Sequence, residues 1–114
     1  MKKDLIFAPA LLAIGVLLFL LRATGMTAHI VISVIGVFAL IAYTVLTKKE
    51  WKIIPLEILM RAFYGIALII GIVIMNVHGI VALAVIHKVS AVLFMALIIV
   101  LLVTKLASQK DADA

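Results

Sequence analysis

Two histidines, His29 and His87, are the residues whose type and position best fit a chemical role in this sequence. Each lies near the start of an apolar run that ends in a Thr-Lys step. The distance along the chain is 18 residues from His29 to Thr47 and 17 residues from His87 to Thr104. Two helices that cross a membrane in the same direction therefore hold these imidazoles at matched depth. Imidazoles on facing helices can hold one haem between them, so we interpret the pair as the axial ligands of a haem b.

Small residues follow each histidine at helical spacing. Ser33 and Gly36 come one and two turns after the first histidine, and Ala91 comes one turn after the second. Gly15 and Gly71 fall at comparable depth on the other two apolar runs. Such residues let a flat macrocycle approach the helix backbone, although they also permit close helix packing with no cofactor.

Two cations, Arg22 and Lys88, lie near the membrane face that the histidines share. Either can bind a haem propionate through a charge-assisted hydrogen bond, or extend to lipid phosphate instead. The second N–H of each axial imidazole also needs an acceptor. We expect a backbone carbonyl one turn earlier, that of Gly25 or Leu83.

Other interpretations of the histidines stay open. His29 can be an interfacial residue that touches water and headgroups, and His87 can hydrogen-bond a neighbouring helix. Ionisable residues within spans also serve proton relays and ion transport. The third histidine, His78, has no carboxylate or cysteine near it and predicts no zinc site.

The elements that must position these residues are apolar helices. The chain has 114 residues, of which 68% are hydrophobic and 13% are charged, whereas a soluble domain carries about 25% charged residues. A membrane span needs roughly 20 apolar residues. The predicted helices of this single transmembrane domain cover residues 5–22, 27–47, 53–76 and 79–105, followed by a disordered tail over 108–114.

The N-terminal apolar run is longer than the core of a usual signal peptide and lacks a clear cleavage site, which predicts that it is kept as a span. Cysteine is absent, and this excludes disulfides, thiolate catalysis and iron–sulfur ligation. The net charge of +5 is carried by basic residues at the predicted helix ends. It therefore indicates contacts with lipid headgroups and membrane topology, and no nucleic acid partner.

Short connections make consecutive helices antiparallel, so the predicted fold class is an all-α, integral membrane, up-down-up-down four-helix bundle. Basic residues gather on one side of this bundle. They are Lys2, Lys3, Lys48, Lys49, Lys52, Lys105 and Lys110. The positive-inside rule therefore predicts that both termini are cytoplasmic, in a multi-pass protein of the inner (cytoplasmic) membrane.

A second polar group lies near the predicted cytoplasmic end. Glu57 and Arg61 are four residues apart, which puts opposite charges on one helix face. Tyr43 and Thr47 fall at the same end of the second predicted helix. We interpret the charged pair as an ion pair that anchors the third helix, or as part of a polar pocket for a proton, an ion or a quinone head.

The whole arrangement resembles the small four-helix membrane b-type cytochromes, a group that includes cytochrome b561-like proteins and the anchor subunits of quinone-linked dehydrogenases. The resemblance rests on His29 and His87 on alternate helices, on the small residues after each, and on the basic residues near the interface. It implies one-electron transfer near the outer face, with a quinone or a redox protein as partner.

We therefore expect a membrane electron-transfer protein that holds one haem b by bis-histidine ligation, either a carrier or a component of a quinol-linked oxidoreductase. One alternative is a small oligomeric transporter or pore, whose conduit would form between subunits. Another is a non-catalytic accessory subunit of a larger membrane complex. The expected partners in every case are the lipid bilayer and, in an oligomer, further copies of the chain.

Overall fold

The computed structural model describes residues 2–20, 26–51, 53–77 and 79–113, and all its regular elements are helical. These elements are α1 (Lys2–Leu20), α2 (Met26–Thr47), the short 3-10 helix η2 (Lys48–Glu50), α3 (Ile54–Asn76) and α4 (Val81–Asp113). The prediction of an all-helical chain with four long helices is confirmed. The structure has α4 continuing through Asp113, whereas the sequence predicts a helix end at 105 and a disordered tail over 108–114.

Three of the described helices are long and apolar enough to cross a membrane. They cover Thr27–Glu50, Ile54–Asn76 and Val81–Ala107. At 1.5 Å per residue, about 22 residues rise roughly 33 Å, slightly more than the hydrocarbon core of a bilayer. The described apolar part of α1, Leu5–Leu20, is shorter. The predicted first span over 5–22 runs past this helix into residues 21 and 22, which lie outside the described residues.

Large apolar side chains cover the outer faces of these helices. Phe38 and Val45 on α2 are 68% and 73% exposed, and Ile69 on α3 and Val81 on α4 are 61% and 76% exposed. Soluble monomers rarely expose apolar patches of more than a few hundred Å². This surface indicates that the protein resides in a lipid bilayer.

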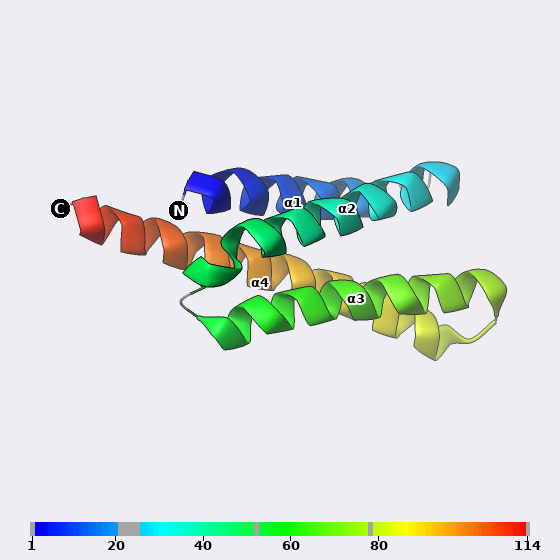
Figure 1. The fold of residues 1–114 in the computed structure, drawn as a ribbon. Coiled ribbons are helices and arrows are strands. Elements are labelled where there is room, and N and C mark those ends of the chain that lie inside the picture. The colour runs from blue at the N-terminus through cyan, green and yellow to red at the C-terminus, as the bar shows by residue number, and fades with distance from the viewer. Residues whose placement is uncertain (1, 21–25, 52, 78, 114) are drawn as a thin grey trace.

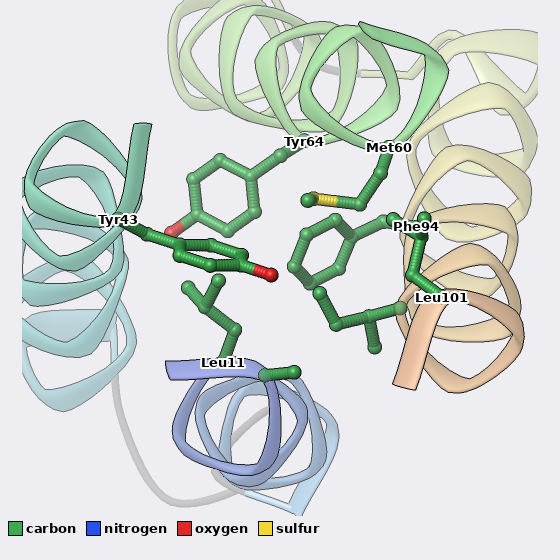
Figure 2. Close-up of a cluster of buried hydrophobic side chains, with 8 residues drawn as sticks. Leu11, Tyr43, Met60, Tyr64, Phe94 and Leu101 are labelled. Atoms are coloured by element: carbon green, nitrogen blue, oxygen red, sulfur yellow. The ribbon is translucent and has the colours of Figure 1, made fainter. Parts of the chain in front are cut away.

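The four helices surround one core. α3 packs along α4, and α1 packs against both α2 and α4. Figure 1 shows both ends of the chain on the same side of the molecule as the connection between α2 and α3. In the view of Figure 2, α2 and α4 lie on opposite sides of the core, so their side chains meet across it.

Aromatic residues fill much of the core. The rings of Tyr64 and Phe94 meet edge to face with centroids 5.0 Å apart, and those of Phe7 and Tyr43 stack at 5.4 Å. Each helix contributes at least one fully buried side chain, and Figure 2 labels six members of the cluster. The buried set comprises Ala8, Leu11, Tyr43, Met60, Tyr64, Phe94, Ile98 and Leu101.

Candidate functional site

The histidine rings meet across the core, at the end of the bundle away from η2. The ring centroids of His29 and His87 are 6.4 Å apart, and the ring planes are inclined by 53°. Metal–imidazole bonds of about 2.0–2.1 Å put two rings on opposite sides of one metal with centroids about 6 Å apart. The observed separation therefore fits two ligands of one metal ion.

The two rings line one pocket, which has a cavity volume of about 70 Å³. Of the residues singled out in the sequence, the pocket lining contains Gly15, His29, Ser33, His87, Lys88 and Ala91. It also contains residues that the sequence analysis did not assign to a site, among them Phe19, Tyr64, Ala67, Leu68, Phe94 and Met95.

His87 is oriented by α3. Its Nδ1 lies 2.7 Å from the backbone carbonyl oxygen of Ala67. A carbonyl only accepts hydrogen bonds, so Nδ1 carries the proton and donates, and Nε2 of the neutral ring keeps its lone pair. The expected acceptor, the carbonyl of Leu83, was wrong, because the ring turns to the carbonyl of Ala67 on α3 instead. A fixed Nδ1–H tautomer is the state in which an imidazole binds a metal through Nε2.

Gly71 makes this close approach possible. A Cβ on Gly71 would lie 3.0 Å from Cε1 and 3.4 Å from Nδ1 of His87. The imidazole therefore lies against the backbone of α3, within reach of the Ala67 carbonyl one turn earlier. Gly71 is the neighbour that sets how closely the ring approaches this helix.

We expect Gly71→Ala to push the His87 ring away by a few tenths of an ångström and to weaken its hydrogen bond to Ala67. The ¹⁵N chemical shifts of the imidazole nitrogens, measured without any ligand, should then lose the clear Nδ1–H tautomer. Gly65→Ala on the same helix is the matched control, because a Cβ there meets nothing within 4 Å. Identical imidazole shifts in wild type and Gly71→Ala would contradict this role.

The ring of His29, unlike that of His87, is not oriented by a hydrogen bond at Nδ1 to any described residue. Its Nδ1 is buried and has no hydrogen-bond partner among the described residues. The nearby hydroxyl of Ser33 donates to the backbone carbonyl of His29 at 2.8 Å and leaves the ring alone. The expected acceptor Gly25 lies outside the described residues. A buried polar atom without a partner costs about 1–3 kcal/mol, so this ring is suited to binding a ligand.

The other residues predicted to contact the cofactor do not all line the pocket. Lys88 is exposed and lines the pocket, while Arg22 lies outside the described residues. Gly36 is absent from the pocket lining and faces Tyr64 instead: a Cβ there would lie 3.0 Å from Cζ of Tyr64 and collide with its hydroxyl. The structure therefore gives Gly36 a packing role, in contrast to the predicted contact with a porphyrin edge.

In the part of the chain that the structure describes, no three or more His, Cys, Asp or Glu residues gather to hold a bare metal ion. Two imidazoles alone make a poor site for a bare ion, which takes about four ligands or more from protein and water. They suffice for a metal that arrives in a macrocycle, because the ring nitrogens fill the remaining positions.

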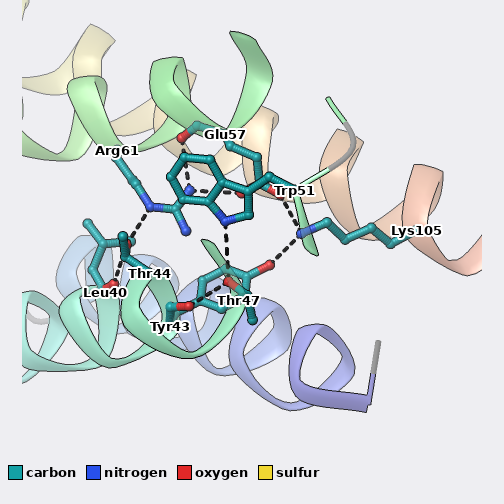
Figure 3. Close-up of polar contacts among 8 residues, drawn as sticks. All are labelled: Leu40, Tyr43, Thr44, Thr47, Trp51, Glu57, Arg61 and Lys105. Carbon is teal, nitrogen blue, oxygen red and sulfur yellow. Dashed lines mark hydrogen bonds and ion pairs between the residues drawn. The ribbon is translucent and has the colours of Figure 1, made fainter. Parts of the chain in front are cut away.

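A second cluster lies at the other end of the bundle, where α2 meets η2 (Figure 3). The fully buried Glu57 binds Arg61 through Oε2 at 2.8 Å and Lys105 through Oε1 at 2.6 Å. The Lys105 contact is an ion pair by distance and lacks the alignment of a good hydrogen bond. The sequence pointed to the first pair by its spacing but gave no indication that Lys105, from α4, joins it.

Residues of α2 complete this ion-pair cluster. Arg61 Nε donates to Thr44 Oγ1 at 2.6 Å, and Lys105 Nζ donates to the Tyr43 hydroxyl at 2.8 Å. The guanidinium carbon of Arg61 lies 4.3 Å from the centroid of the Trp51 ring, a cation–π distance. The cluster thus ties together α2, α3 and α4, a wider connection than the predicted anchoring of the third helix alone.

No protein-family model, curated protein or solved structure matches the chain. The resemblance to small b-type cytochromes therefore stays a prediction, and function has to be argued from these two sites.

Proposed function

We propose that this chain is a membrane electron carrier that holds one haem b between His29 and His87. The observation that supports this most directly is the 6.4 Å separation of two imidazoles that face each other across an apolar pocket. When bound, the haem supplies reversible one-electron chemistry at its iron.

Each residue of the pocket has a distinct part in this proposal. His87 offers Nε2 because Ala67 holds its Nδ1 proton, and His29 offers a ring whose Nδ1 is buried without a partner among the described residues. Ala91 has a small side chain in the pocket lining, and Lys88 lies where it can neutralise a propionate. Gly15 also lines the pocket, but the Met95 side chain packs against it, so Met95 would have to move for a macrocycle to approach there. The apolar walls exclude water and so favour the less charged form of the cofactor.

In the membrane, we propose an up-down-up-down bundle with both termini in the cytoplasm and the histidine pair near the outer face. The arrangement of Figure 1 supports this, because both chain ends lie at the same end of the bundle as the segment that carries Lys48 and Lys49. Basic residues favour the cytoplasmic side, that of the inner membrane in a bacterium. The electron partner is then a quinone or a redox protein that reaches the open mouth of the pocket.

The test is an absorption spectrum of protein purified in detergent with haem supplied. We expect a Soret band that shifts on reduction and is lost in both His29→Ala and His87→Ala. His78→Ala is the matched control, since the sequence gives this third histidine no part in the site. Wild-type protein that takes up no haem, or a band that survives both substitutions, would overturn the proposal.

A further inference from the structure

The four helices are not packed equally closely around the core. Among the described residues, α3 packs along α4 and α1 packs against both α2 and α4, but α2 and α3 are not among the closely packed pairs. These two helices are nevertheless neighbours around the core in the view of Figure 2. We call the line along which they face each other the α2–α3 seam. The bundle therefore consists of two helix pairs, α1–α2 and α3–α4, whose closest mutual contact is that of α1 with α4.

Tyr64 crosses this seam from α3. Its hydroxyl donates a hydrogen bond to the backbone carbonyl of Ser33 on α2 at 2.8 Å, and Figure 2 shows its ring reaching from α3 toward α2. The hydroxyl lies where Gly36 leaves space, because a Cβ at that position would collide with it. A side chain therefore joins the two helices at this level, in place of close contact between their backbones.

A second link across the seam lies nearer to η2. There Arg61 Nε donates to Thr44 Oγ1 at 2.6 Å, within the ion-pair cluster. On the side of Tyr64 away from η2, no hydrogen bond or ion pair between described residues joins α2 to α3. The histidine pocket lies on that side, and both Tyr64 and Ser33 line it. The hydrogen bond between these two residues is thus the last polar link across the seam before the pocket.

The pocket is small in this closed arrangement. Its cavity volume is about 70 Å³, whereas pockets that bury drug-sized ligands measure about 300–1,000 Å³. Met95 also packs against Gly15 at one wall. A macrocycle can therefore lie between the histidines only if the two helix pairs move apart. Separation along the seam leaves the packing of α1 on α2 and of α3 on α4 intact, and it takes His29 on α2 away from His87 on α4.

We propose that the α2–α3 seam is a lateral entrance to the histidine pocket and that the Tyr64–Ser33 hydrogen bond holds this entrance closed. The ligand that enters is haem, and this part of the inference rests on the proposed function. Opening of the seam, in contrast, is a property of the haem-free chain. Both helices carry large exposed apolar side chains, so the entrance faces the hydrocarbon of the bilayer. An apolar macrocycle dissolved in lipid then reaches the histidines without passing through water.

Spin labels test the opening without haem. The chain has no cysteine, so labels can be attached through Val31→Cys on α2 and Ile69→Cys on α3, at two exposed positions. In lipid nanodiscs, pulsed electron paramagnetic resonance should show a longer α2–α3 distance in a fraction of the molecules. Tyr64→Phe should raise this fraction about fivefold, because one hydrogen bond across the seam is lost. Labels attached through Ile69→Cys and Val89→Cys, within the α3–α4 pair, are the control and should keep one distance.

The rate of haem uptake tests the entrance. The Soret band should grow about fivefold faster after haem addition in Tyr64→Phe than in wild type, because the open form is more populated. Tyr43→Phe, which removes a phenol hydroxyl from the same core near η2, should leave the rate unchanged. A cleavable reagent that links the side chains introduced by Val31→Cys and Ile69→Cys should stop uptake, and cleavage should restore it. The same link between positions 69 and 89 should have no effect.

These measurements separate the entrance from its ligand. Equal α2–α3 distances in wild type and folded Tyr64→Phe, or haem uptake that continues in the linked protein, would disprove the inference. If Tyr64→Phe does not fold, the linked protein alone decides. A seam that opens in a chain that then binds no haem would contradict the proposed function and would leave the lateral entrance in place.

Discussion

Glu57→Gln is expected to destabilise the bundle by about 3 kcal/mol or more, because it removes a buried carboxylate that pairs with two cations. Glu57 is fully buried and uses one carboxylate oxygen for Arg61 and the other for Lys105. Glutamine keeps the size of the side chain, so the loss measures charge rather than packing. The free energy of unfolding in mixed detergent micelles is the measurement that checks it.

Lys105→Met tests the same cluster by removing one of its two cations. This substitution leaves the Glu57–Arg61 pair with balanced charge, so we expect a smaller loss than for Glu57→Gln. Combining the two substitutions should cost less than the sum of the single effects, because both break the same Glu57–Lys105 ion pair. Lys49→Gln, at an exposed position in η2, is the control and should change stability by about 0.5 kcal/mol or less. Strictly additive losses would contradict the shared carboxylate.

Gly36→Ala is expected to destabilise the protein by about 2 kcal/mol, a typical cost of overpacking a core. The new methyl group would collide with the Tyr64 hydroxyl and would also lie 3.2 Å from Ile14 Cγ2. Tyr64 cannot easily move aside, because its hydroxyl donates to the Ser33 carbonyl at 2.8 Å and its ring packs on Phe94. Thermal unfolding followed by circular dichroism gives the size of the effect.

The control substitution, Gly65→Ala, is expected to stabilise the protein, whereas Gly36→Ala destabilises it. Gly65→Ala places a methyl group where nothing lies within 4 Å, so it should gain up to about 1 kcal/mol from helix propensity. Tyr64→Phe removes the hydroxyl with which the methyl collides, and Gly36→Ala should therefore cost less in that background than in wild type. Equal costs in the two backgrounds would show that Gly36 does not serve to accommodate Tyr64.

The sequence was sufficient for the helical elements and for the depths of their residues. Long apolar runs predicted the helices, and α2 and α3 begin and end within one residue of the predicted limits. A constant rise per residue fixes height along a helix, so counting back from Thr47 and Thr104 placed His29 and His87 at the same level. The i, i+4 spacing likewise identified the pair formed by Glu57 and Arg61.

Only the tertiary structure decided which neighbours these residues meet. A helix that is apolar on all sides has no apolar stripe to show which face is turned toward the core. The sequence therefore did not reveal that the Ala67 carbonyl accepts a hydrogen bond from His87, or that Lys105 reaches Glu57. The same holds for Gly36. The sequence shows that this residue is small, but not that it accommodates the Tyr64 hydroxyl, which comes from another helix. Height is a local property of one helix, whereas the facing side and the distance between helices result from the packing of all four.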